Sequence, residues 1–381
     1  MKILVSLPKW NGQYSGVEYH RCFIPFKNIP NVIFTDNIEN VKPSFLIENN
    51  IGIVWFNRNI SPLTLNPDLI YRTLRNMGIK IVCDLDDNWN VGFGHVLYDA
   101  MIKHNFKNSN ISQIKAADYV CVTHEVLANL VHKELKVSKH RIIIAPNGID
   151  PNEPQYAQEF NYNLKNIFWQ GSVTHHHDLK LISEAVSEHK IFIAGYDPTS
   201  HKDITDYSKI DLTPNGGLFD DKPWVYALKE YERIEHVPER LKTKIYHWEE
   251  TGKLFKRKQW IHSLPSNEYM NFYQNKGICL IPLEKNKFTT CKSNLKMLEA
   301  GWAKKPVIVS GVHPYTTLGK DGVNCEFAGN KDQWKESIDY LLENPNYADD
   351  LRFKLHEDIK EKYLIEKVNQ SRINLIEKIS K

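Results

Sequence analysis

Short apolar runs alternate along the chain with polar turns and with segments long enough to form a helix. In the first part of the sequence these runs lie at residues 3–7, 52–56, 79–83, 119–122 and 142–145. Helix-length segments stand between them, notably at 67–77 and 123–135. Because a strand, a helix and a further strand at this spacing favour a parallel sheet wrapped by helices, the alternation predicts an α/β domain.

The alternation is interrupted once by turn-forming residues and then begins again. Residues 146–154 contain three prolines and a glycine, which break the pattern. After the break, further strands are expected at 167–169, 190–194, 277–282 and 305–310. A length of 381 residues also predicts two to three domains at about 150 residues each. We therefore expect Rossmann-like domains over 1–152 and 153–346, followed by a C-terminal helix over 347–381.

One stretch of the second domain does not follow the alternation. Residues from about 197 to 265 have few strand signals and many aromatic side chains. From Lys222 to Trp260, ten Lys or Arg minus six Asp or Glu gives a net charge of +4, against +3 for the whole chain. Such a segment can hold a polyanion through phosphate contacts and stacking, or form a helical hairpin with an aromatic core and a solvated face. We interpret it as an inserted helical and aromatic segment.

The composition excludes several other classes of protein. With 41% hydrophobic and 25% charged residues the chain can bury sizeable cores, which argues against a disordered or fibrous protein. No apolar run approaches the roughly 18 residues that cross a bilayer, and the first apolar run is too short for a signal peptide. The six cysteines form no C-x-x-C pair, so we expect reduced, buried thiols. Together these features predict a cytoplasmic protein.

Residues 292–310 carry the most informative motif. If a helix begins near Ser293, then Lys292, Lys296 and Glu299 are spaced i, i+4 and i+7 and share one stripe. A helix N-terminus beside two lysines favours a diphosphate, and a carboxylate further along can accept hydrogen bonds from a ribose diol. The same spacing also fits an ordinary amphipathic helix with solvated Lys and Glu side chains.

This segment resembles the donor-binding motif of the GT-B glycosyltransferases, in particular the retaining group called family four. In that family a Glu-Ala pair, here Glu299 and Ala300, precedes a turn and a Pro-Val-Ile strand, here residues 306–308. Other segments that resemble the family occur in the family's order: Tyr19-His20-Arg21 with Pro25, Pro146-Asn147-Gly148-Ile149-Asp150, and Gly171-Ser172. The resemblance covers most of the chain outside the inserted segment.

The resemblance implies two facing Rossmann-like domains of the GT-B type. It also implies transfer of a hexosyl or pentosyl group from a nucleotide-diphosphate sugar, such as a UDP-sugar, to an acceptor hydroxyl. The acceptor would be a glycan, a lipid-linked sugar or a nucleic acid. Retained stereochemistry and a reaction without a metal cofactor are implied as well.

The resemblance also implies roles for individual residues. Glu299 would bind the ribose of the donor. The other implied donor-binding residues are Gly16, Gly171, Ser172, Lys292, Ser293, Asn294 and Lys296. The family pattern has a second glutamate eight positions before Glu299, and this chain has Cys291 there. A carboxylate expected beside the donor sugar is therefore missing.

A second cluster of candidate residues directly follows a predicted strand. Asp84 and Asp86 form a D-x-D, which holds a divalent metal in the GT-A class of glycosyltransferases, and Asp87 follows them. Because ligands bind at the carboxyl ends of parallel strands, these aspartates can instead orient an acceptor or act as a general base, or an aspartate can simply cap a helix. We expect catalytic roles for them without a metal. Arg21 and Arg58 follow loops of the same domain and are candidates for acceptor binding.

Three consecutive histidines, at 175–177, precede Asp178 and a helix predicted over 178–188. Neighbouring histidines point in different directions and rarely bind one metal together. We therefore expect His177, or else His175, to contact the donor phosphate, with Asp178 as the helix N-cap.

Three hypotheses follow from the sequence. The first is a metal-independent glycosyltransferase that uses a nucleotide sugar. In the second, the acceptor is a modified base of a nucleic acid held by the basic aromatic segment. In the third, the protein keeps the fold and binds ligands without catalysis. A dehydrogenase is disfavoured because no predicted strand leads into a G-x-G-x-x-G.

Overall fold

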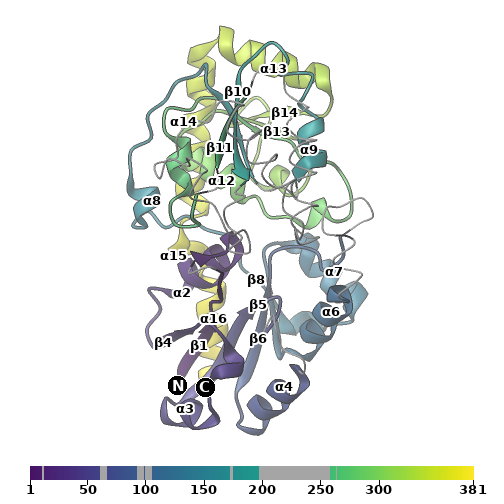
Figure 1. Ribbon diagram of the computed structural model, residues 1–381, viewed down its shortest axis with the longest axis vertical. Coiled ribbons are helices and arrows are strands. Elements are labelled where there is room, and N and C mark those ends of the chain that lie inside the picture. The colour runs from purple at the N-terminus through teal and green to yellow at the C-terminus, as the bar shows by residue number, and fades with distance from the viewer. Residues whose placement is uncertain are drawn as a thin grey trace, which may run out of the picture.

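The computed structural model describes residues 1–10, 13–60, 67–91, 98, 105–171, 175–196, 258–262 and 264–381. In this part of the chain, two six-stranded parallel sheets form two lobes, one built from the first half of the chain and one from the second (Figure 1). The predicted α/β class with two sheet domains is confirmed.

The first sheet has the strand order β4-β1-β5-β6-β7-β8 and is parallel throughout. Its strands are β1 (Lys2–Ser6), β4 (Val32–Thr35), β5 (Ile51–Asn57), β6 (Lys80–Leu85), β7 (Tyr119–Val122) and β8 (Ile142–Ile144). All five predicted strands are present. The sixth, β4, escaped prediction because it is a short edge strand with no buried residue. A small antiparallel ribbon, β2 (Lys9–Trp10) with β3 (Gln13–Tyr14), follows β1.

The second sheet has the order β11-β10-β9-β12-β13-β14 and is also parallel. Its strands are β9 (Ile167–Gln170), β10 (Ile191–Tyr196), β11 (Lys258–His262), β12 (Cys279–Ile281), β13 (Val307–Ser310) and β14 (Glu326–Ala328). β11 lies inside the segment that the sequence assigns to an insertion over 197–265, so the end of that segment is an edge strand of the sheet. Residues 197–257, which hold most of the basic aromatic segment, lie outside the described residues.

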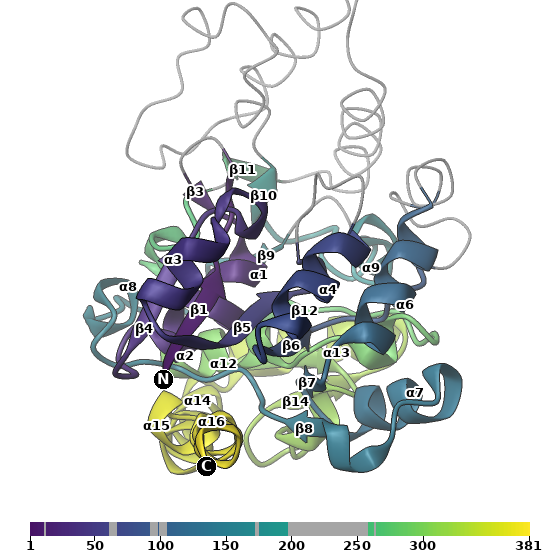
Figure 2. The same ribbon diagram turned by 90° about the horizontal axis from the view of Figure 1, so that it is seen from below.

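Helices cover both faces of the first sheet. One face packs against α3 (Pro43–Glu48), α4 (Pro67–Asn76), α6 (Phe106–Ala116) and α7 (Glu125–Leu135). The other face packs against a helical segment after β1 and against α16 (Gln370–Ser380). Figure 2 shows α4 and α6 on one side of this sheet and α16 on the opposite side. The segment after β1 consists of α1 (Gly16–Glu18), the π-helical turn η1 (Tyr19–Phe23) and α2 (Ile24–Phe26).

The second sheet is covered in the same way. One face packs against α8 (Pro154–Ala157), the 3-10 helix η7 (Tyr269–Tyr273), α12 (Leu295–Trp302) and part of α14 (Pro345–Lys362). The other face packs against α9 (His176–Lys180), α13 (Lys331–Glu343) and the first turns of α14. Turns occupy residues 181–188, so the helix predicted over 178–188 is limited to the five residues of α9.

The C-terminal segment contains three helices where the sequence predicts one helix over 347–381. α14 belongs to the second domain, α15 (Ile365–Val368) follows a backbone bridge between Leu364 and Ile149, and α16 returns to the first sheet. Figure 1 shows α16 in the lobe that holds the N-terminus, with both ends of the chain close together. Both domains are thus tied together by this segment as well as by the linker near Ile149.

Two smaller expectations can be compared with the structure. All six cysteines are buried and free, as predicted. Among the helices of the described residues, none has both the length and the apolar character that a membrane span requires.

Candidate functional site

A pocket of about 450 Å³ lies between the two domains, at the carboxyl ends of the strands in both sheets. The first domain contributes the residues after β1, including Tyr14, Gly16 and His20, and Asp86 after β6. The second domain contributes Gly171 after β9, Gly195 in β10 and the start of α12. Carboxyl ends of parallel strands are where α/β proteins bind ligands, because the loops there can converge without breaking the sheet. This pocket is the candidate functional site.

The N-terminus of α12 opens into this pocket. The helix begins at Leu295 with Asn294 as its N-cap, one residue after the predicted N-cap Ser293, and no side chain caps its first amides. Ser293, Leu295 and Lys296 line the pocket. The first turn of a helix leaves amide groups without an intrahelical acceptor, and these groups attract anions. An anionic group at this position would therefore meet both the amides and the Lys296 side chain.

Lys296 is held in place by its surroundings. Its ammonium lies 4.9 Å from the centre of the Trp169 ring, and burial lowers its pKa to about 8. Gly171 makes this position available, since a Cβ there would lie 2.7 Å from Nζ of Lys296 and 2.4 Å from the Trp169 ring. Gly195 in the next strand is equally constrained, because a Cβ there would lie 1.4 Å from the Gly171 carbonyl oxygen. The glycine predicted for donor binding thus provides space for the lysine.

The Gly171→Ala variant should therefore lose both stability and ligand affinity. Because Trp169 is fully buried, the added methyl must displace Lys296 or shift the ring, and such overpacking costs about 1–3 kcal/mol. Thermal unfolding and titration with UDP would measure the two effects. In Gly16→Ala the new Cβ would meet no atom within 4 Å, so the unfolding temperature should stay unchanged. Wild-type stability and affinity in Gly171→Ala would contradict this role for the glycine.

Glu299 lies one turn after Lys296 and is almost completely buried, with 2% of its surface exposed. The Tyr269 hydroxyl donates a hydrogen bond to its Oε1, and Tyr273 is a second hydroxyl partner. Burial raises the pKa of Glu299 to about 7, although both hydroxyls and the Lys296 charge act in the opposite direction. The carboxylate lines the pocket and can accept hydrogen bonds from a diol.

Asp84 and Arg21, predicted as a catalytic and an acceptor-binding residue, are paired with each other. Arg21 donates from Nε to Oδ1 of Asp84 at 2.7 Å and from Nη2 to Oδ2 at 3.1 Å, and both side chains are buried. Arg372 of α16 approaches the same carboxylate, at 4.0 Å. Because both oxygens of Asp84 are engaged by guanidinium groups, we assign the pair a structural role. This arrangement disfavours a direct catalytic role for Asp84, whereas acceptor binding by Arg21 stays a prediction, since Arg21 forms part of the pocket wall.

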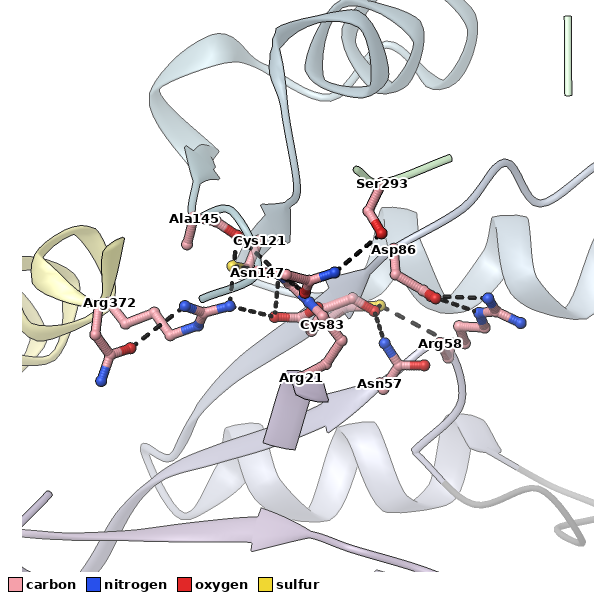
Figure 3. A network of polar contacts seen from close by, with 12 residues as sticks. Arg21, Asn57, Arg58, Cys83, Asp86, Cys121, Ala145, Asn147, Ser293 and Arg372 are labelled. Carbon is pink, nitrogen blue, oxygen red and sulfur yellow. Dashed lines mark hydrogen bonds and ion pairs between the residues drawn. The ribbon is translucent and has the colours of Figure 1, made fainter. Parts of the chain in front are cut away.

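Asp86 keeps a place in the pocket wall. Arg58 donates from Nε and Nη2 to Oδ1 of Asp86, at 3.0 and 2.8 Å (Figure 3). Burial opposes ionisation of Asp86, but the charge and hydrogen bonds of Arg58, together with the Arg21 charge and a backbone hydrogen bond, hold the pKa below its usual range. Arg58 does not line the pocket. The structure pairs it with Asp86 and also with Asp87, and its role in acceptor binding stays a prediction.

Asp87 and Lys292 face each other across the domain boundary, with Nζ of Lys292 3.7 Å from Oδ2 of Asp87. Neither residue lines the pocket. Lys292 precedes the helix and therefore does not follow the helical spacing that the prediction assumed. Burial raises the pKa of Asp87. The structure thus brings together a catalytic and a donor-binding candidate outside the pocket wall.

Among the three histidines, His175 rather than His177 lines the pocket. Its Nδ1 lies 2.6 Å from Oδ2 of Asp178, whose Oδ1 accepts a hydrogen bond from the backbone amide of Glu284. Burial lowers the pKa of His175 to about 3, helped by the nearby Lys296 charge, so this imidazole is neutral. His177 is exposed, and His175 occupies the N-cap position that the sequence assigns to Asp178. Ser172 lies outside the described residues.

The boundary between the domains is crossed by polar contacts that the sequence did not indicate. Asn147 accepts from Arg21 and donates to Oγ of Ser293 at 3.0 Å (Figure 3). His124 Nε2 lies 3.0 Å from the carbonyl oxygens of Cys291 and Lys292. The side chain of Cys291 packs into the core of the first domain, away from the pocket. Position 291 therefore supplies neither a carboxylate nor a side chain that lines the pocket.

The sequence did not identify two further residues of the pocket, His20 and Tyr269. Nε2 of His20 lies 2.8 Å from the Tyr269 hydroxyl and 3.7 Å from Oε1 of Glu299. These residues are 249 positions apart in the chain, and neither stands in a recognisable catalytic pattern. His20 adjoins Arg21 in the segment that resembles the family, which was the one available signal.

Three comparisons with solved structures are informative. A glycosyltransferase from Rickettsia africae aligns with a TM-score of 0.58 and 10% identity, over 100% of this chain and 98% of its own. The Anabaena protein HepE, in complex with UDP-glucose, aligns with a TM-score of 0.60 and 11% identity, over 99% and 100%. Sucrose-phosphate synthase from Thermosynechococcus elongatus aligns with a TM-score of 0.56 and 13% identity, over 88% and 75%. No family model and no curated protein matches the sequence.

The chain therefore has the GT-B fold, as the sequence resemblance implied. Identities of 10 to 13% establish this fold and nothing finer. The residues of the pocket between the two domains, rather than the fold, therefore indicate the function.

Proposed function

We propose that the protein is a glycosyltransferase that transfers a hexosyl or pentosyl group from a UDP-sugar to an acceptor hydroxyl. The observation that carries the proposal is the start of α12, where free helix amides, Lys296 and Glu299 face one pocket between two domains. A diphosphate matches the amides and the ammonium, and a ribose diol matches the carboxylate. The solved HepE structure with a similar fold contains UDP-glucose, which supports a UDP-sugar as the donor.

The pocket wall supports one orientation of such a donor. Its apolar part consists of Ala194, Leu264, Pro265 and Phe272 of the second domain, and suits a nucleobase. Lys296 and the start of α12 then receive the diphosphate, and the sugar extends toward Gly16 and Asp86 of the first domain. Gly16 is exposed, and a Cβ there would point into open space, so the glycine leaves room for a bulky group.

In the proposed reaction the bond between the anomeric carbon and the diphosphate oxygen breaks while the acceptor oxygen bonds to that carbon. Negative charge grows on the leaving diphosphate, and Lys296 with the helix amides stabilises it without reorganisation. If stereochemistry is retained, the leaving phosphate oxygen takes the proton of the acceptor hydroxyl. These protein groups supply the stabilisation in a reaction without a metal cofactor. We propose that this is how the enzyme works.

Asp86 is the remaining candidate for handling the acceptor. The two hydrogen bonds that Arg58 donates to Asp86 both end on Oδ1, and a third goes to Asp87, so Arg58 leaves Oδ2 of Asp86 able to accept from a hydroxyl in the pocket. Because Arg58 keeps the pKa of Asp86 low, the carboxylate is charged at neutral pH and suits orientation of an acceptor better than proton donation.

A thermal-shift experiment with UDP and GDP tests the donor site. At 100 times its Kd, UDP should stabilise the wild type by about 2.7 kcal/mol, and Glu299→Ala should lose most of this stabilisation because the ribose diol loses its acceptor. Each variant is compared with its own ligand-free form. Glu326→Ala is a matched control, since Glu326 also accepts from a tyrosine, Tyr347, but lies outside the pocket wall. If neither nucleotide stabilises the wild type, the assignment of the donor site is wrong.

A further inference from the structure

His20 connects the first domain to the carboxylate of the second domain. It lies in η1, and its ring contacts the Tyr269 hydroxyl and approaches Glu299 Oε1, at 2.8 and 3.7 Å. Tyr156 also places its hydroxyl 3.2 Å from that of Tyr269. All four side chains are buried. The Tyr269 hydroxyl is therefore the junction of a polar network that spans the domain boundary.

The direction of each hydrogen bond follows from the number of protons available. Tyr269 has one hydroxyl proton, and its contact with an ionised Glu299 uses that proton. Its oxygen must then accept from His20 and from Tyr156, so Nε2 of His20 carries the proton. Nδ1 of His20 has no partner within the described residues, which fits a lone pair better than a buried donor. Burial lowers the pKa of His20 to about 3, so the ring is neutral and a single tautomer suffices.

We propose that His20 is a positioning residue of the donor pocket, which acts through the Tyr269 hydroxyl to keep Glu299 ionised and oriented for the ribose diol. The inference rests on the proposed function, because it assumes that Glu299 binds the donor. A hydroxyl group that accepts a hydrogen bond becomes polarised and donates its own hydrogen bond more strongly. His20 therefore strengthens the bond from Tyr269 to the carboxylate, and it does so only when the two domains are together.

Charged and titratable groups surround Glu299 on every side. On α12, Lys296 lies one turn earlier. From η7 come Tyr269 and Tyr273, and from α8 comes Tyr156. Cys279 of β12 and Tyr315 after β13 also interact with the carboxylate, and from the first domain come His20 and, behind it, Arg21. Lys296 and the two tyrosines of η7 favour the charged carboxylate, while burial disfavours it. Because these effects nearly balance, loss of the hydrogen bond from His20 to Tyr269 should raise the pKa of Glu299 measurably.

The test measures the affinity for UDP-glucose by calorimetry across pH in the wild type, His20→Phe and His20→Gln. UDP-glucose is the probe because its diphosphate does not titrate in this range. In the wild type, affinity should fall as Glu299 becomes protonated on acidification. Phenylalanine keeps the ring and excludes water but cannot donate, so the fall should begin about 0.5 to 1 pH unit higher. Glutamine can place an amide donor near the Nε2 position and should restore much of the wild-type profile.

His132→Phe is the matched control, because His132 is a partly buried histidine of the same domain whose Nδ1 contacts the Val137 carbonyl, outside the pocket. In this variant the affinity for UDP-glucose should depend on pH as it does in the wild type. An unshifted profile in His20→Phe, or a loss of affinity equal at every pH, would overturn the proposal, as would a His20→Gln profile identical to that of His20→Phe. If His20→Phe does not fold, Tyr269→Phe breaks the same link and should shift the profile in the same direction. Absence of UDP-glucose binding in the wild type would instead refute the proposed function.

Discussion

Replacement of Lys296 by methionine should weaken UDP binding by about 10- to 100-fold and slow donor turnover by about 100- to 1000-fold. Methionine keeps the length of the side chain and its contact with the Trp169 ring, but removes the ammonium. The effect on turnover should exceed the effect on binding, because charge on the leaving diphosphate grows as the bond to the sugar breaks. Calorimetry with UDP and the rate of UDP-sugar hydrolysis without acceptor would measure the two quantities.

The pH dependence gives this prediction a second readout. Burial lowers the pKa of Lys296 to about 8 and raises that of Glu299 to about 7. Above pH 8 the lysine becomes neutral and attracts the diphosphate less, and below pH 7 the glutamate becomes protonated and accepts less well. Affinity for UDP-glucose should therefore be highest between pH 7 and 8. In Lys296→Met the fall at alkaline pH should disappear while the fall at acidic pH remains.

Lys305→Met is the control for Lys296→Met. Lys305 is fully buried in the same domain, donates to the Asn161 carbonyl at 2.7 Å, and lies outside the pocket wall. Its loss should leave UDP affinity unchanged. If the two methionine variants bind UDP equally well, or if Lys296→Met keeps the alkaline fall, Lys296 does not contact the diphosphate.

The central strands were predictable from the sequence because each is a continuous apolar run. The residues of β5 and β6 are buried with few exceptions, as in any parallel sheet that is covered on both faces. β4 and β14 lie at sheet edges and contain one buried residue between them, Ala328, so their apolar signal is weak. β11, also at an edge, was hidden in a basic aromatic stretch. Edge strands therefore account for the strands of the two large sheets that the sequence did not predict.

Residues of the site were predictable only where they lie on the same secondary-structure element. Lys296 and Glu299 are one turn apart on α12, so their spacing indicated a shared face. Lys292 lies before the true helix start and turns to Asp87 instead. Pairs of residues from distant segments of the chain could not be recognised from the sequence. Arg21 and Asp84 are 63 positions apart, and a buried pair looks in the sequence like two free site residues.

The largest effect on stability is expected from Arg21→Met. Arg21 has 1% of its surface exposed, and besides Asp84 it donates to the Ala145 carbonyl and to Asn147. Its removal leaves Arg372, at 4.0 Å, as the remaining cation paired with the buried Asp84 carboxylate in the described part of the chain. Breaking a buried pair by removing one partner costs about 3–5 kcal/mol, because the remaining charge is not compensated. For a domain of this size, thermal unfolding should occur roughly 10 °C lower.

A double variant distinguishes the effect of the broken ion pair from the effect of lost side-chain packing. In Arg21→Met with Asp84→Leu no uncompensated carboxylate remains, so the double variant should recover a large part of the stability. Arg58→Met is the control, because the side chains of Arg58 and Asp86 are 37% and 13% exposed, so water can partly solvate the carboxylate that remains and the loss of stability should be smaller than in Arg21→Met. If Arg21→Met and Arg58→Met unfold at the same temperature, or if the double variant is less stable than Arg21→Met alone, the buried charge at Asp84 is not what Arg21 compensates. Recovery in the double variant would show that the pair tolerates replacement by apolar groups, unlike Lys296 and Glu299, whose replacement by methionine and alanine should weaken UDP binding.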